Sequence, residues 1–440
     1  MNATDDLERR LTAWLGDQAP LREPDGLLDQ VTREVARSGR VPGWAIPERW
    51  IPVTLTLRLA AVPRALIILL CLALLMAALA AGGLVAGSFR QALASVPEPT
   101  GPARNGLIAY ADLGDIWLVD QLGEGRRQLT SGPDLDYVGA WSPDGTWLAY
   151  WSVAYSGDPA DPVARREAGR LGNDLSIRLI RPGDPEPRII TSGLRWGANG
   201  ESSITWAPDS SAIAYDHRAA SGAEVVEIAQ LDDGETRVLV TYAATPTWSP
   251  DGRTIAFVTN RFPLDPDGVR GSGFGLKTVP AAGGEPRPLS RARGNDEAFF
   301  WPQWSNDSRW VLYHAGDIFV ASADGSGESA ITSSPESESH PRWSPANDRI
   351  AFLRHGPDGT PVVITDADGS SEVVLDDVPA SGQAPIWSPD GRRLLIGTEG
   401  EDGRPDGLVV LDLTSATPPL RIPAHAVDLR GHAAWQRLAP

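Results

Sequence analysis

The sequence Trp141-Ser-Pro-Asp-Gly145 decides the fold of this chain, because it returns along the chain at a nearly regular interval. The same five residues begin at Trp248 and at Trp387, and altered copies begin at Trp206 (WAPDS), Trp304 (WSNDS) and Trp343 (WSPAN). Successive copies lie 65, 42, 56, 39 and 44 residues apart. An interval of roughly 40 to 45 residues is typical of repeats that each form one four-stranded unit. The chain therefore contains an array of such units, two of which carry insertions.

Each copy predicts a β-hairpin. An aliphatic residue lies seven positions after the tryptophan, and an aromatic or aliphatic residue lies nine positions after it, as Leu148 and Tyr150 do in the first copy. Apolar residues at alternate positions after a turn indicate a strand with a buried face. Within the turn, proline presets the first corner, aspartate accepts backbone hydrogen bonds, and glycine (or Asn347 in the copy at Trp343) takes the left-handed conformation. The aspartates of these turns, such as Asp144, are therefore turn residues first of all.

Two further strands follow each hairpin. The third is predicted, for example, at Asp115 to Val119, and the short fourth at Arg127 to Thr130. Four antiparallel strands form one blade of a β-propeller. The first unit begins at Gly106 without an opening strand, and the chain ends with an unmatched one at Ala433 to Gln436. Joining these ends closes a ring, so we predict an all-β, seven-bladed β-propeller over residues 105–437. Its structural tryptophans are Trp141, Trp206, Trp248, Trp304, Trp343, Trp387 and Trp435.

An apolar segment upstream of the propeller predicts a membrane anchor. Residues 65–87 form a run of 23 residues without a charge, which is long enough as a helix to cross a bilayer core of roughly 30 Å. Because 64 residues precede the run, we interpret it as an uncleaved transmembrane helix rather than a cleaved signal peptide. We expect a single-pass protein of the cytoplasmic membrane with its N-terminus inside and its propeller outside. The arginines that flank the run favour this orientation by one charge only.

Three short segments lie on either side of the predicted anchor, outside the propeller. Residues 1–40 carry two amphipathic helical patterns and are expected to form a cytoplasmic helical segment, with a loosely ordered tail as the alternative. Residues 41–64 are rich in proline and contain Trp44 and Trp50, which suits a juxtamembrane segment. Residues 88–104 form a linker. The apolar stripes of residues 1–40 must meet each other, the membrane surface or a cytoplasmic regulator.

The charge of the chain argues against a nucleic-acid partner. Residues 1–64 carry nine acidic and nine basic side chains, so the formal net charge of −18 falls entirely on the residues after them, with 48 acidic against 30 basic side chains. A surface of that sign repels the phosphate backbone. The single cysteine, Cys71, lies within the apolar run, which excludes an intramolecular disulfide and a cysteine-rich metal site.

The repeated words also resemble those of a known family. Trp-Ser-Pro-Asp-Gly, followed by patterns such as Thr254-Ile-Ala-Phe257 and turns such as Asp366-Ala-Asp-Gly369, is similar to the TolB-like propeller repeat, a relative of WD repeats. The resemblance covers the propeller region and implies a fold rather than an activity. The plan of a cytoplasmic segment, one helix and an outer domain is similar to that of membrane-bound anti-sigma factors, although the His and Cys zinc motif common in them is absent.

Catalytic chemistry finds little support in the sequence. There is no Gly-x-Ser-x-Gly elbow, and the only lysine, Lys277, does not belong to a phosphate-binding loop. Four histidines, which come from different blades without metal-ligand spacing, are expected on one rim and interpreted as solvent-facing. They are His217, His314, His340 and His355. We therefore expect no catalytic residue, no metal and no cofactor, and infer that the chain is not an enzyme.

Two long insertions suggest where a partner binds. Residues 152–174 and 260–274 join the second and third strands of their blades, and loops of more than about 12 to 15 residues are usually functional or disordered. These loops and the connections between blades emerge on one face. Aromatic residues and arginine there suit a binding surface. The candidate binding face comprises Tyr137, Tyr155, Trp196, Phe262, Arg270, Phe299, Trp301 and His340. The alternative is that the aromatic residues are buried in the blades.

These observations predict a membrane-anchored, extracytoplasmic propeller that binds a protein or an envelope ligand as a scaffold or sensor. One alternative is an anti-sigma-like regulator in which the propeller is the sensor. Another is a hydrolase that uses the channel of the propeller.

Overall fold

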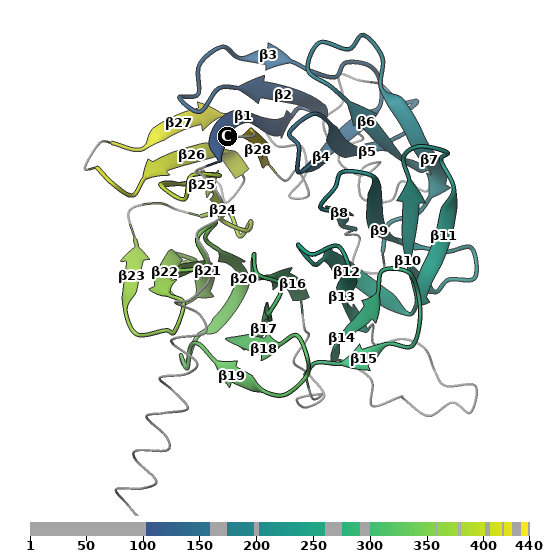
Figure 1. Cartoon of the computed structure of the whole chain (residues 1–440). Coiled ribbons are helices and arrows are strands. Elements are labelled where there is room, and N and C mark those ends of the chain that lie inside the picture. Colours follow the sequence, from purple (N-terminus) through teal and green to yellow (C-terminus); the bar gives the residue numbers. More distant parts are fainter. Residues whose placement is uncertain are drawn as a thin grey trace, which may run out of the picture. The chain divides into compact units, whose positions relative to one another are not determined.

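The structure is a computed structural model that describes most of the predicted propeller. Within it, 28 strands form seven antiparallel sheets of four strands each, which surround a central opening (Figure 1). The predicted all-β, seven-bladed fold is confirmed. The described residues are 103–158, 174–197, 202–259, 275–290, 300–357, 359–376, 378, 380–400, 405–415, 418–424 and 433–438.

Three predicted features lie outside these residues. They are the N-terminal segments with the anchor at residues 65–87, the greater part of the first insertion (159–173) and the second insertion (260–274). Over the part of the chain that is described, no helix has the length and apolar character needed to cross a membrane.

Blade 1 contains strands from both ends of the propeller, and blades 2 to 4 follow it around the ring. In each blade the strands run in order from the innermost to the outermost. Blade 1 contains β28 (Ala434–Leu438), β1 (Arg104–Asp112), β2 (Asp115–Val119) and β3 (Arg127–Gln128). Blade 2 contains β4 (Leu135–Trp141), β5 (Leu148–Val153), β6 (Leu175–Ile180) and β7 (Arg188–Leu194). Blade 3 contains β8 (Ile204–Trp206), β9 (Ala212–Arg218), β10 (Glu224–Gln230) and β11 (Thr236–Thr241). Blade 4 contains β12 (Ala243–Trp248), β13 (Thr254–Thr259), β14 (Gly275–Pro280) and β15 (Arg287–Pro288).

The remaining three blades complete the ring in the same order. Blade 5 contains β16 (Phe300–Trp304), β17 (Trp310–Ala315), β18 (Asp317–Ser322) and β19 (Glu328–Ala330). Blade 6 contains β20 (Ser337–Trp343), β21 (Arg349–His355), β22 (Val362–Asp366) and β23 (Glu372–Leu375). Blade 7 contains β24 (Ile386–Trp387), β25 (Arg393–Glu399), β26 (Pro405–Asp412) and β27 (Leu420–Pro423).

The repeated turn joins the first two strands of a blade and also links neighbouring blades. In the first copy, the Ser142 hydroxyl donates to Asp144 (2.5 Å), which in turn accepts from the Thr146 amide (2.9 Å), and Gly145 takes a left-handed φ of 71°. Ser210 and Ser308 take the same conformation in the altered copies, at φ values of 62° and 60°. Left-handed φ values are strained for serine. Here the serine hydroxyls accept the amides of Asp144 (3.3 Å) and Asp251 (2.9 Å) in the preceding repeat's turn, so the altered turns connect blades.

The repeat tryptophans pack between blades. The indole nitrogens of Trp206, Trp304 and Trp387 donate to the backbone carbonyls of Ala140 (3.0 Å), Thr247 (3.0 Å) and Arg342 (3.1 Å), each in the innermost strand of the preceding blade. Trp248 differs, because its indole nitrogen donates to Gly252 in its own turn (3.1 Å).

The residues nine positions after the tryptophans form the centre of the blades. Tyr150, Tyr215, Tyr313, Phe257 and Phe352 are among the largest fully buried side chains, as the alternation in the sequence predicts.

The predicted ring closure is present. Strand β28, from the C-terminal end of the chain, pairs with β1 and becomes the innermost strand of blade 1. The side-chain amide of Gln436 accepts from the Leu107 amide (2.9 Å) and donates to the Gly145 carbonyl of the next blade (2.7 Å). On the other side, Asn105 accepts from the Asp390 amide in blade 7 (3.1 Å). Blade 1 is thus bonded to both of its neighbours.

Candidate functional site

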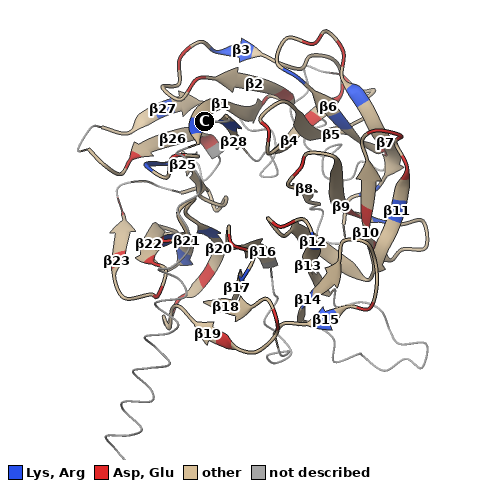
Figure 2. Cartoon of the chain, in the orientation of Figure 1, with Lys and Arg blue, Asp and Glu red and all other residues tan. Residues whose placement is uncertain are grey.

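The seven innermost strands enclose a channel of about 560 Å³, with residues of all seven blades in its wall. One position recurs in every blade, the residue directly before the repeat tryptophan, and all seven such residues line the channel. In chain order they are Ala140, Thr205, Thr247, Gln303, Arg342, Ile386 and Ala434. We call this set the channel ring. Arg342 is its single charged member, whereas most charged positions of the propeller lie on turns and outer strands (Figure 2).

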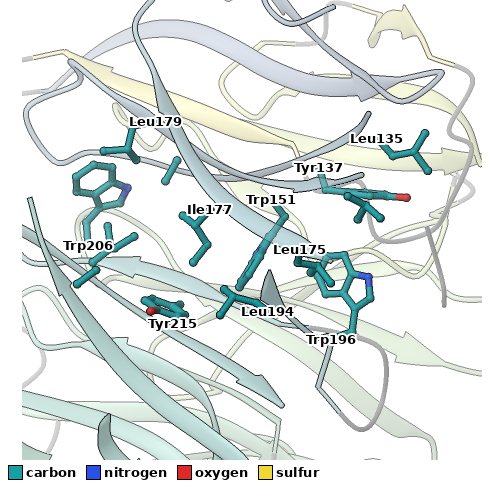
Figure 3. Packing of buried hydrophobic residues seen from close by; sticks show 14 of the residues in the cluster. Leu135, Tyr137, Trp151, Leu175, Ile177, Leu179, Leu194, Trp196, Trp206 and Tyr215 are labelled. Atoms are coloured by element: carbon teal, nitrogen blue, oxygen red, sulfur yellow. The ribbon is translucent and has the colours of Figure 1, made fainter. Parts of the chain in front are cut away.

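Three of the predicted binding residues line this channel. They are Tyr137 in β4, Trp196 after β7 and Trp301 in β16. Tyr137 and Trp196 meet edge to face with ring centroids 5.8 Å apart, and Trp151 lies 5.5 Å from Trp196. Tyr137, Trp151 and Trp196 belong to a buried cluster between blades 2 and 3 (Figure 3). They therefore serve both the packing of the blades and the wall of the channel.

The other predicted binding residues lie elsewhere. Tyr155 is buried in the same cluster, where its hydroxyl donates to the Asp158 carbonyl (3.0 Å), and it does not line the channel. The His340 ring lies tilted against Trp301 with ring centroids 5.7 Å apart. Phe262, Arg270 and Phe299 fall outside the described residues.

A backbone irregularity sets the conformation of the channel wall. Thr245, Trp301 and His340 have left-handed φ values of 49°, 57° and 55°, and each directly precedes a proline in the innermost strand of its blade. The strand pairing shifts register at each of these places. Such conformations cost about 1 to 3 kcal/mol each and concentrate at functional sites. The pattern x-Pro-x-Trp recurs at these three places and also at Ala384, which is not left-handed, so the pattern marks the candidate positions without deciding the conformation.

Beside Trp301 lies a group of histidines around a serine. The Ser339 hydroxyl is 2.6 Å from His355 Nε2 and 2.9 Å from His340 Nδ1, and the His314 ring stacks on His340 at 6.1 Å. Burial, followed by the charges of His355 and Arg342, lowers the pKa of His314 to about 4, so this ring is neutral at pH 7. A serine hydroxyl within hydrogen-bonding reach of an imidazole is one element of nucleophilic catalysis. Ser339 itself is buried and does not line the channel.

The expectation that the four histidines face solvent is wrong for two of them. His217 in β9 and His314 in β17 are only 7% and 8% exposed. His217 lies 3.4 Å from Glu227 and stacks on Tyr215. No group of His, Cys, Asp or Glu side chains in the described part of the chain has the arrangement of a metal site.

Buried carboxyl groups secure the ends of several strands. Asp136 accepts from Ser152 (2.6 Å), and Asp216 accepts both the amide (2.8 Å) and the hydroxyl (2.9 Å) of Ser203. Burial raises the pKa of Asp136 to about 6 and that of Asp216 to about 7. Glu338 is also buried, where it accepts from Thr332 and pairs with Arg354 at 2.7 Å. These bonds within the blades, and from the segment after β19 to β20 in the case of Glu338, give the three carboxyl groups a structural role.

The comparisons with known proteins identify structures of similar fold. A putative TolB from Agrobacterium tumefaciens is 21% identical, with 66% of this chain and 96% of that chain covered and a TM-score of 0.43. An oligogalacturonate lyase in complex with manganese is 14% identical over 74% of this chain and 85% of that chain, with a TM-score of 0.50. A puromycin-hydrolyzing peptidase of Mycobacterium tuberculosis is 16% identical over 75% of this chain and 56% of that chain, with a TM-score of 0.47. No protein-family model matches the sequence, and no curated protein is detectably similar to it.

One of these structures corrects the inference that the chain is not an enzyme. Oligogalacturonate lyase has the same propeller fold and is an enzyme, so the absence of familiar catalytic motifs in the sequence does not exclude catalysis by this chain. One fold can carry many unrelated functions, so the lack of a recognised motif was not a sufficient basis for that inference.

The resemblance to TolB-like propellers is confirmed at the level of the fold. The resemblance implied a propeller, and the described residues form seven four-stranded blades. The chain thus contains a seven-bladed β-propeller.

Proposed function

We propose that this chain is a membrane-anchored propeller that binds a protein or an envelope ligand at its central channel, on the outer side of the cytoplasmic membrane. The observation that carries the proposal is the channel itself, which has a volume of about 560 Å³ and aromatic side chains in its wall. Binding sites are usually concave and mostly apolar, with a few convergent polar groups. The channel combines Tyr137, Trp196 and Trp301 with the polar Gln303 and Arg342.

The strained backbone of the channel wall supports the same proposal. Thr245 and Trp301 line the channel in left-handed conformations that the fold alone does not require, since other innermost strands lack them. Strain of this kind is retained where a side chain must be held in a particular direction. The uncharged run at residues 65–87 supports the anchor. Residues 1–40 would then lie inside, where a cytoplasmic regulator could meet them.

Photo-crosslinking in native membranes tests binding at the channel. We expect p-benzoylphenylalanine in place of Trp301 to give a light-dependent adduct of the full chain, detected as a mass shift. The matched control replaces Val373, which is 58% exposed on the outermost strand of blade 6, far from the channel in the strand order. An adduct from position 301 alone supports the proposal. Equal adducts from both positions, or an adduct from position 373 alone, would contradict it.

A further inference from the structure

The channel ring contains one charge, and that charge has no counter-ion in the described part of the propeller. Arg342 is partly buried, and the only hydrogen bond of its side chain to the described residues is from Nη1 to the neighbouring Pro341 carbonyl (3.3 Å). Burial lowers the pKa of Arg342 to about 10, so the guanidinium still carries its charge at pH 7. A desolvated cation without a partner costs free energy. The described contacts of the propeller therefore leave the positive charge of Arg342 without a counter-ion.

Other partly buried arginines of the propeller are paired. Arg178 binds Asp134 at 2.8 Å, Arg354 binds Glu338 at 2.7 Å, and Arg393 lies 3.3 Å from Asp412. Their side chains are 17 to 23% exposed, a degree of burial similar to that of Arg342. The propeller thus normally supplies a carboxylate to an arginine in this setting. Arg342 is the exception among them, and it points to the channel that it lines.

Two side chains near Arg342, those of Gln303 and His314, are uncharged at pH 7. Gln303, the adjacent member of the channel ring, uses its side-chain oxygen to accept the Trp343 amide (2.6 Å), which leaves its NH2 group as a donor. The side chain of Arg342 also consists of donors only. His314, whose pKa the Arg342 charge helps to lower, is neutral at pH 7. Two neighbouring donors in an apolar wall favour an acceptor with negative charge.

We propose that Arg342 anchors an anion site in the central channel, which binds the carboxylate of a ligand with an aromatic or apolar body. This inference rests on the proposed binding function and names its ligand class. The planar fork of one guanidinium matches a carboxylate, which accepts two parallel hydrogen bonds. Phosphate sites, by contrast, commonly use glycine-rich backbone amides or helix N-termini, and the described residues contain no helix. The aromatic wall with Trp301 provides contact for the body of the ligand.

The carboxylate could belong to a small acid or to the C-terminus of a peptide, and isothermal titration of the full chain in detergent distinguishes the two. The probes are phenylacetate and its neutral analogue phenylacetamide, then acetyl-Ala-Phe with a free and with an amidated C-terminus, and inorganic phosphate. We expect at least one free carboxylate to bind, and its neutral analogue to bind about tenfold more weakly or not at all. Preference for the peptide pair or for the phenylacetate pair identifies the source of the carboxylate.

Two substitutions locate the site. R342Q removes the charge and is expected to weaken binding of the carboxylate probe about tenfold, without changing binding of the neutral analogue. R127Q is the control for loss of a positive charge, because Arg127 is exposed on β3, the outermost strand of blade 1, and does not line the channel, so this variant should bind like the unsubstituted chain within about twofold. R342K, which keeps the charge without the fork, should give an intermediate affinity. The thermal unfolding midpoint of each variant verifies that it is folded.

The outcomes separate this inference from the proposed function. Equal binding of the carboxylates and their amides, unchanged by R342Q, would leave the channel as a binding site and overturn the anion site. Failure of the unsubstituted chain to bind any carboxylate probe, or tighter binding of inorganic phosphate, would also overturn it. Neither result would alter the crosslinking from position 301, which tests the channel independently of the ligand's charge.

Discussion

Removal of the last eight residues is expected to open the propeller. A chain that ends at His432 lacks β28, so it loses the pairing with β1 and leaves β1 with an unpaired edge. It also loses Trp435, which is 7% exposed in the cluster between blades 7 and 1, and both hydrogen bonds of Gln436. Loss of a buried tryptophan side chain alone costs about 3 to 5 kcal/mol. We therefore expect a much lower urea midpoint and a broader transition, measured by tryptophan fluorescence.

Two controls show whether the effect belongs to β28. A chain that ends at Leu438 lacks only Ala439 and Pro440 and should unfold like the full chain, because the paired residues remain. Addition of a synthetic peptide of residues 433–440 to the chain that ends at His432 should restore part of the lost stability. An unchanged urea midpoint after removal of β28 would refute the account of the closed ring.

Replacement of Asp216 by asparagine is expected to stabilise the propeller at neutral pH. The carboxyl is 2% exposed, and burial, opposed by the bonds from Ser203, raises its pKa from 3.8 to about 7. At a pH between these two pKa values, the Asp216 carboxyl is deprotonated in the unfolded chain and protonated in the folded chain. The contribution of Asp216 to stability is therefore present in full below pH 4 and is lost as the pH rises to 7. A shift of about three pKa units corresponds to about 4 kcal/mol.

Asparagine resembles the protonated aspartic acid in shape and has no proton to lose. Its side-chain oxygen can accept the two bonds from Ser203 that Asp216 accepts. Asp216→Asn should thus match the unsubstituted chain near pH 4 and exceed it in urea midpoint at pH 8, with the difference growing between. A difference that stays constant from pH 4 to pH 8 would show that the buried carboxyl does not titrate in this range.

Asp324 provides a control of the opposite sign. It lies in an exposed turn, where hydrogen bonds from Ser326 and Ser322 lower its pKa to about 2. Its contribution to stability is present above pH 4 and is lost only as the pH falls towards 2. Asp324→Asn should therefore not stabilise the propeller at pH 8, which separates the effect of burial from a general effect of reduced negative charge.

Local sequence patterns predicted the blades because each blade depends on a turn and on alternation. The turn at Trp141 and the buried Tyr150 are fixed by residues within ten positions of each other. Ring closure was also predictable, because a missing strand at Gly106 and a surplus strand at Ala433 complement each other. The serines at positions 210 and 308 were not recognised as turn equivalents of glycine, because their strain is offset by hydrogen bonds to another blade.

The channel was less predictable than the fold. The sequence placed Tyr155 on the binding face, but the structure buries its side chain in the cluster between blades 2 and 3. The contacts of Ser339 with His340 and His355 depend on a left-handed residue and a register shift that change which way side chains point. Whether a carboxylate of the described residues pairs with Arg342 depends on which of them the fold brings near, which is set by contacts between distant residues. Only the three-dimensional structure supplies such information.

The proposed topology places the propeller outside the membrane and residues 1–40 inside. The chain contains one cysteine, Cys71, so a Cys71→Ala background permits single-cysteine labelling. Ser326→Cys places a thiol in the exposed turn between β18 and β19, and Ser38→Cys places one before the anchor. With a membrane-impermeant maleimide on right-side-out vesicles, we predict labelling of the Ser326→Cys chain before detergent is added and of the Ser38→Cys chain only afterwards. Labelling in the reverse order, or recovery of the full chain without membranes, would contradict the account.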